Sequence, residues 1–156
     1  MGVGILASSN AEVTVVYTGV LAPEKGNPLA NRLCYLFLHL SEIIDKFSPD
    51  EVAIEEPFAS RNIRTAMAIG QAQAVAMVAA AQHKLPISSY APRRVKQSVT
   101  DHGGSSKIQV QEMVAVLLGL DTLPDSFDAA DALAVAICHI NSCLLYTSDA
   151  ADDTPC

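Results

Sequence analysis

The chain has 156 residues, half of them hydrophobic, and a formal net charge of −7 at neutral pH. That length predicts one domain with a substantial core. It contains no uninterrupted apolar run of about 18 residues, which argues against a membrane span, and its start lacks the basic segment of a signal peptide. The four cysteines, at 34, 138, 143 and 156, show no ligand spacing, which argues against a zinc site and favours a reduced, cytoplasmic protein.

Hydrophobic periodicity and turn residues then divide the chain into strands and helices. The predicted elements are, in order, strands over 2–7 and 12–20, a helix over 28–47, a strand over 52–54, a helix over 61–84, a strand over 85–90 and helices beginning at 92, 105 and 128. Because the first two strands are joined by a short turn, they are expected to form a hairpin. The order predicts an α/β domain in which this antiparallel hairpin joins parallel strands.

Acidic residues follow the strand over 52–54 and open the last predicted helix. Glu55 and Glu56 come directly after the strand, at the edge where open α/β sheets bind ligands. Asp128 and Asp131 are spaced i, i+3 and share one helix face. One reading is structural: Glu55 and Glu56 mark the strand end, Asp128 is the N-cap and Asp131 supports the helix dipole. The other is that three acids converge to hold Mg²⁺ for phosphodiester cleavage.

The basic residues are concentrated in the middle of the chain. Between Pro57 and Lys107 there are seven basic residues and one acid, a net charge of +6. This block is either an ordinary solvated surface or the phosphate-binding face of an enzyme that acts on nucleic acid. A separate possibility concerns the long helix over 61–84, whose many small residues allow close approach of the domain's own sheet or of a second subunit.

The segment 143–156 is expected not to be native protein. Residues 143–152 back-translate to the transposase adapter used to build sequencing libraries, so we predict read-through into adapter DNA. The predicted domain therefore covers 1–142. Without the tail, 14 acids stand against 10 basic residues, for a net charge of −4. The tail's Asp149 and Asp152 copy the spacing of Asp128 and Asp131 by accident and are assigned no function.

Several separate stretches together resemble the RuvC family of crossover-junction endonucleases. The matching stretches, in the family's order from Met1 to about Ser142, are Val-Ala-Ile-Glu-Glu-Pro-Phe, Gly-Gln-Ala-Gln-Ala-Val-Ala, Tyr-Ala-Pro-Arg-Arg-Val-Lys-Gln-Ser-Val-Thr, Lys-Ile-Gln-Val-Gln-Glu-Met-Val and Asp-Ala-Ala-Asp-Ala-Leu-Ala-Val-Ala-Ile-Cys-His. The resemblance implies a ribonuclease H-like mixed sheet flanked by helices. It also implies a homodimer, Mg²⁺-dependent resolution of four-way (Holliday) junctions with two ions, and a branch-migration helicase as partner.

The resemblance also implies roles for individual residues. Glu55, Asp128 and Asp131 match the family's catalytic and metal-binding acids. Phe58 matches an aromatic residue that contacts bases near the crossover. Basic residues of the +6 block match DNA-binding positions: Arg93, Arg94, Lys96 and Lys107.

One family feature is not found in this sequence. The family begins with a central strand that ends in Gly-Ile-Asp-Pro-Gly and supplies a further metal-binding Asp, whereas the chain begins at what resembles the second strand. We therefore expect a truncated, inactive form of a junction-resolving nuclease. The alternatives are a non-catalytic junction-binding fragment, or an actin-like ATPase or sugar kinase of the same fold. The latter need a glycine-rich phosphate hairpin, which is not visible.

Overall fold

The computed structural model describes residues 1–10, 12–57 and 62–151. Its elements are, in chain order, β1 (Gly2–Ser9), β2 (Glu12–Val20), α1 (Leu29–Phe47), β3 (Val52–Glu55), α2 (Ile63–Gln82), β4 (Ile87–Tyr90), α3 (Pro92–Thr100), α4 (Lys107–Leu117) and α5 (Phe127–Ala151). Every predicted element is present, in the predicted order and with its bounds shifted by only a few residues. The predicted α/β class is confirmed.

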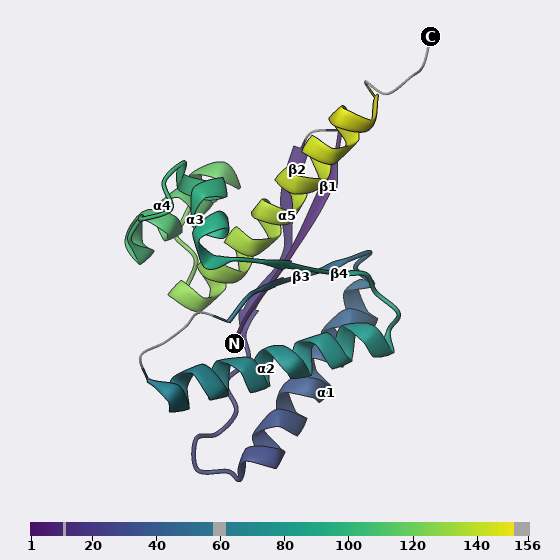
Figure 1. Ribbon diagram of the computed structural model, residues 1–156, viewed down its shortest axis with the longest axis vertical. Helices are drawn as coiled ribbons and strands as arrows, with labels where there is room; N and C mark the ends of the chain where they lie inside the picture. Colours follow the sequence, from purple (N-terminus) through teal and green to yellow (C-terminus); the bar gives the residue numbers. More distant parts are fainter. Residues whose placement is uncertain (11, 58–61, 152–156) are drawn as a thin grey trace.

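The long strands β1 and β2 form the predicted hairpin. They pair antiparallel from Gly2 opposite Val20 to Ser9 opposite Glu12, with a bulge between Ile5 and Leu6. The turn uses Asn10 with a φ of 50°, a left-handed conformation that asparagine tolerates well. Figure 1 shows the hairpin running alongside the last helix.

Strands β3 and β4 form a separate parallel pair, with Val52 opposite Ile87 and Glu55 opposite Tyr90. The parallel pairing is as predicted, but no hydrogen bonds join it to the hairpin, so the described residues form two two-stranded sheets. Helix α5 connects them instead, since it packs against both β1 and β3. Gly4 permits this close packing, because a Cβ there would lie 2.9 Å from the Leu133 side chain. The central strand expected from the resemblance stays a prediction.

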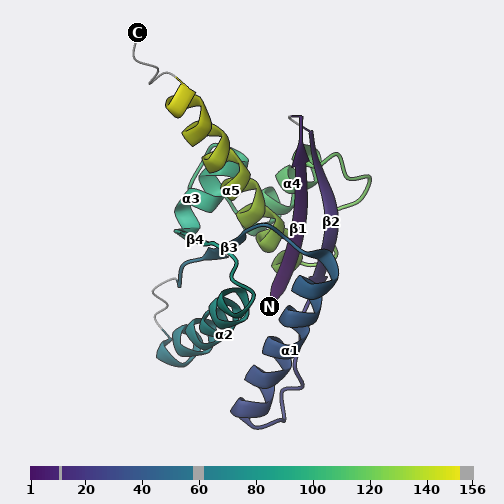
Figure 2. The same cartoon turned by 90° about the vertical axis from the view of Figure 1, so that its right-hand side faces the viewer.

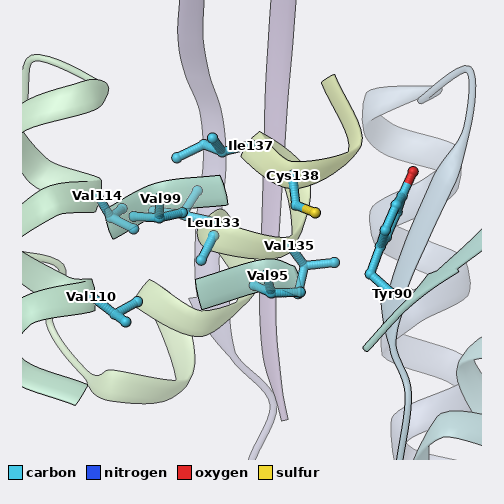
Figure 3. Close-up of a cluster of buried hydrophobic side chains, with 10 residues drawn as sticks. Tyr90, Val95, Val99, Val110, Val114, Leu133, Val135, Ile137 and Cys138 are labelled. Atoms are coloured by element: carbon cyan, nitrogen blue, oxygen red, sulfur yellow. The ribbon is translucent and has the colours of Figure 1, made fainter. Parts of the chain in front are cut away.

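The hydrophobic core has two parts. One gathers buried side chains from β4, α3, α4 and α5 (Figure 3): Tyr90, Val95, Val99, Val110, Val114, Leu133, Ala134, Val135, Ile137 and Cys138. The other lies where α1 and α2 meet and contains Leu21, Leu36, Leu40 and Ala79. The parallel pair lies between these two layers, with α5 on one side and α2 on the other (Figures 1 and 2).

Helix α5 is the only described helix that is long and apolar enough to cross a membrane. Its segment Phe127–Leu145 has a mean hydropathy of 1.3, and 39% of it is buried inside the protein. Leu133 and Ala134 are fully buried against neighbouring elements. The core helix of a soluble domain can have the same length and composition, so the helix is weak evidence for a span.

Candidate active site

Glu55 is the last residue of β3 and lies at the end of a half-buried strand. Ile54 before it is 9% exposed and anchors the strand, while Glu56 and Pro57 after it are exposed. The Glu56 N–H donates to the Tyr90 carbonyl at 2.8 Å, which completes the pairing with β4. On the other edge, the Gln73 side chain of α2 donates from Nε2 to the Glu55 carbonyl at 2.5 Å. Glu55 is therefore held at the carboxyl end of β3, on a strand that is fixed from both sides.

Asp128 and Asp131 lie in the first turns of α5. The Ala129 N–H donates to Ser126 Oγ at 3.1 Å, so Ser126 provides the side-chain cap that the structural reading gave to Asp128. Ala129 and Ala130 are 3% and 1% exposed, which anchors this turn against the core. Asp131 is half-buried, whereas Asp128 is exposed. Neither carboxylate is used for capping, so both are available to bind a ligand at the start of α5.

The negative charges of the Glu55 and Asp131 carboxylates repel each other. Burial raises the pKa of the Glu55 carboxyl above its usual value, and the nearby Asp131 charge raises it further. Burial likewise raises the pKa of the Asp131 carboxyl, with a smaller contribution from Asp128. Of the three predicted acids, Asp131 therefore lies near both Glu55 and Asp128. Their shared negative charge favours the binding of a cation.

Lys96 and Lys107 are the nearby positive charges. Both lower the pKa of Glu55 and of Asp131, which places them beside the carboxylates. Lys107 is the first residue of α4, whose start is fixed by a capping box between Ser106 and Gln109. Its Nζ lies 6.0 Å from the centre of the Phe127 ring. The two lysines therefore offset part of the negative charge of the two carboxylates.

The other predicted DNA-binding residues are placed differently. Arg94 is exposed, lies 5.3 Å from the Tyr90 ring centre and donates to Ser142 Oγ at 3.1 Å. Ser142 is eleven residues after Asp131, roughly 16 Å along the helix, so Arg94 does not join the acids. Arg93 is exposed on α3 and covers Gly103, where an added Cβ would lie 2.6 Å from the Arg93 Cγ. Phe58 lies outside the described residues.

Sequence reasoning missed three residues at this site. Ser126 and Phe127 directly precede the predicted aspartates, and a serine ahead of an apolar helical run is a recognisable capping signal. Gln73 was quoted as part of a matching motif but given no role. Its position on a helix of mostly small apolar residues carried no sequence signal for this contact.

A second polar cluster lies further along α5. His139 contacts the Tyr90 hydroxyl through Nδ1 at 2.7 Å and Glu51 Oε2 through Nε2 at 2.8 Å. Cys143 Sγ lies 3.8 Å from the same Nε2, and the ligand atoms of Glu51, His139 and Cys143 are close enough to hold a metal ion. This differs from the expectation of no zinc site. Cys143, however, belongs to the segment predicted to derive from an adapter, so we assign no metal site here.

A cluster of carboxylates flanked by lysines at the carboxyl end of a strand in an α/β domain is typical of nucleases that cleave phosphodiesters with divalent cations. A model of the RuvC family, described as crossover junction endodeoxyribonuclease RuvC, matches residues 1–139. The chain therefore belongs to the RuvC family, a family of enzymes. The family predicted from the sequence motifs is confirmed.

Individual relatives agree with this assignment. The chain is 50% identical over 139 residues to a crossover junction endodeoxyribonuclease RuvC from Dehalococcoides mccartyi, covering 89% of this chain and 83% of the relative. It is 45% identical to the same-named protein of Chloroflexus aurantiacus, covering 89% and 85%. The solved structure of Thermus thermophilus RuvC in complex with a Holliday junction substrate superposes with a TM-score of 0.86 at 31% identity, covering 94% of this chain and 89% of that one. The ribonuclease H-like fold is thereby confirmed.

Proposed function

We propose that this chain represents an Mg²⁺-dependent endonuclease that resolves four-way DNA junctions. The observation that carries the proposal is the proximity of Glu55 to Asp131, with Asp128 near Asp131 and with Lys96 and Lys107 near both Glu55 and Asp131. The relatives' name and the Holliday junction bound to the Thermus thermophilus protein support the same substrate for this family. Acids alone would repel DNA, so the lysines are needed to bring a phosphate to them.

The acids fit a divalent metal. Mg²⁺ prefers carboxylate oxygens and keeps several waters, which suits two half-buried acids and one exposed acid at an open edge. Burial is the largest cause of the raised pKa of Glu55 and of Asp131, and a bound cation would offset that cost. We therefore propose Glu55, Asp131 and Asp128 as ligands, with two ions in the active enzyme. Bound Mg²⁺ would supply an activated water and stabilise the leaving oxygen.

The proposed DNA contacts divide into two groups. Lys96 and Lys107 would hold the phosphates next to the bond that is cleaved, because they lie beside the acids. Arg93 and Arg94, exposed on α3, would contact the backbone further away. Phe58 stays a predicted base contact near the crossover, and a branch-migration helicase stays a predicted partner, both implied by the family resemblance.

Helix α2 supports a homodimer. Its apolar residues on one side follow the alternating spacing of four and three that is typical of helix pairs: Ile63, Met67, Gly70, Ala74 and Met77. Ile63 is 74% exposed and Met67 is 59% exposed, although both are large and apolar. Gly70 has open space where a Cβ would stand, which permits close approach of a second helix. Met67→Glu should therefore convert a dimer to a monomer in sedimentation measurements, and an unchanged mass would contradict this interface.

The test of function compares cleavage of a synthetic four-way junction and of its linear duplex arms in Mg²⁺. Three versions are assayed: the chain as printed, residues 1–142, and residues 1–142 preceded by a strand ending in Gly-Ile-Asp-Pro-Gly. We expect the third to cut the junction and spare the duplex, because the resemblance places a further acid on that strand. Junction binding without cleavage in all three would instead support a non-catalytic binder. Equal activity in the first version would show that the added strand is dispensable.

A further inference from the structure

Helices α4 and α5 pack against each other, and the segment that leads into α5 is attached to α4. Lys107 is the first residue of α4, and Phe127 is the first residue of α5. Gln111 lies one turn after Lys107 on the same helix face, and its Nε2 donates to the carbonyl of the buried Pro124 at 2.7 Å. The start of α5 is therefore fixed against the face of α4 that carries Lys107.

Phe127 presents its ring to Lys107 at this junction. The ring is large and apolar, yet the residue is 42% exposed. Lys107 Nζ lies over the ring, 6.0 Å from its centre, which is at the limit of the range in which an aromatic face attracts a cation. Lys107 forms no ion pair with any residue that the structure describes. Its charge nevertheless lowers the pKa of Glu55 and of Asp131, so the ammonium lies near both carboxylates.

From this geometry we propose that Phe127 is a positioning residue that holds the Lys107 ammonium near the acids, ready to bind a DNA phosphate. A lysine side chain is a flexible stem, and restraining it before binding reduces the entropy that is lost when the phosphate binds. The inference rests on the proposed role of Lys107 and adds the residue that fixes its position. The contact joins the starts of two helices and uses no strand edge, so a strand added before β1 leaves it in place.

Phe127 is not needed to anchor the start of α5. Ser126 Oγ already accepts from the Ala129 N–H at 3.1 Å, and Ala129 and Ala130 are buried against the core. As an apolar cover for this turn, a leucine would serve as well as a phenylalanine. Only an aromatic ring attracts an ammonium, so replacing the ring by leucine or by tyrosine separates the two roles.

The first test observes Lys107 directly and needs no DNA. In the chain as printed and in the version with the added strand, the ε-CH₂ proton signals of Lys107 should lie upfield of those of the exposed Lys84, because the ring current shields them. Phe127→Leu should move the Lys107 signals downfield to the Lys84 position, whereas Phe127→Tyr should leave them shielded. Phe37→Leu, at a half-buried position of α1, is the matched control and should not move them.

The second test measures junction affinity in the version with the added strand, without Mg²⁺ so that no DNA is cut. Phe127→Leu should weaken binding about 2- to 5-fold, the range that corresponds to a cation–ring contact at an exposed site. When Lys107→Ala is already present, Phe127→Leu should cause no further loss, whereas with Lys96→Ala present the whole loss should remain. Phe127→Tyr and Phe37→Leu should retain the affinity.

Several results would overturn the proposal. Unshielded Lys107 signals in the unaltered chain, or signals that Phe127→Leu leaves in place, would show that the ring does not restrain the lysine. A loss of affinity that is the same with and without Lys107 would show that Phe127 acts on DNA by another route. Phe127→Met replaces Phe127→Leu if the leucine variant does not fold. If no version binds junctions, the proposed function fails, and the proton signals still decide whether Phe127 holds Lys107.

Discussion

Two polar clusters along α5 have opposite characters. Near the amino end, Asp131 lies close to Glu55 and to Asp128, and burial and like charge raise the pKa of Asp131 and of Glu55. In the middle of the helix, His139 has a partner for each ring nitrogen, the Tyr90 hydroxyl and the Glu51 carboxylate. One helix thus carries a cluster whose charges are not compensated and a cluster whose hydrogen bonds are complete. The first is suited to binding a ligand and the second to joining α5 to the parallel strands.

The largest effect that this comparison predicts is on cleavage. Glu55→Gln keeps the shape of the side chain and removes a metal ligand, so it should reduce junction cleavage about a thousandfold or more in a version that cuts. Junction binding should persist, because no phosphate contact is lost. Glu56→Gln, at the exposed neighbouring acid, is the control and should retain activity. Undiminished cutting by Glu55→Gln would contradict the assignment of the site.

The next effect concerns DNA affinity. Lys96→Ala and Lys107→Ala should each weaken junction binding and reduce the slope of log affinity against log salt by roughly 0.9, the value for one phosphate contact on duplex DNA. Lys84→Ala, at an exposed position of the same basic block after α2, provides the control. A slope that stays the same in both lysine variants would mean that these side chains do not hold phosphates.

The sequence predicted the acids because their signals are local. Glu55 follows a short apolar strand, and Asp128 and Asp131 have helical spacing, so topology alone brings them to one edge. The contact of Gln73 with Glu55 was not predictable in this way. It joins residues eighteen apart across a connection between two elements, and no periodicity signals which helix residue meets a strand end.

The sheet shows a second limit of sequence reasoning. Alternation and β-branched residues predicted both strand pairs, but they do not encode whether two pairs share a sheet. Here helix α5 packs against β1 and β3, and the pairs are not hydrogen bonded to each other. The capping role of Ser126 was locally encoded yet missed, because Asp128 was the more conspicuous candidate.

The third effect concerns the cluster around His139 and should appear in stability alone. Tyr90→Phe removes the hydroxyl bonded to His139 and should lower the free energy of unfolding by about 0.5–1.5 kcal/mol. Cleavage per folded molecule should not change, because the cluster lies away from the acids. Tyr35→Phe, at a half-buried tyrosine of α1, is the matched control. A loss of cleavage greater than the loss of folded protein would show that the two clusters on α5 do not have separate roles.

The smallest effect should come from neutralising an acid of the uncompensated cluster. The pKa of Asp131 is raised on folding, so the folded state favours the protonated carboxyl. The stability that this gives is fully present at a pH below the ordinary pKa of aspartate, and it is lost as the pH rises through the raised pKa. At pH 7 without metal, Asp131→Asn should therefore raise the melting temperature by about 2 °C or less, since solvent screening limits the gain at a half-buried group. The difference should shrink as the pH falls through the raised pKa and vanish in acid.

Added Mg²⁺ should stabilise the unaltered chain more than the variant and so cancel the difference in melting temperature. Asp121→Asn, in an exposed loop, should show neither behaviour. A variant that is destabilised at pH 7 without metal would mean that Asp131 is paired within the fold, and the contrast between the two clusters on α5 would be wrong.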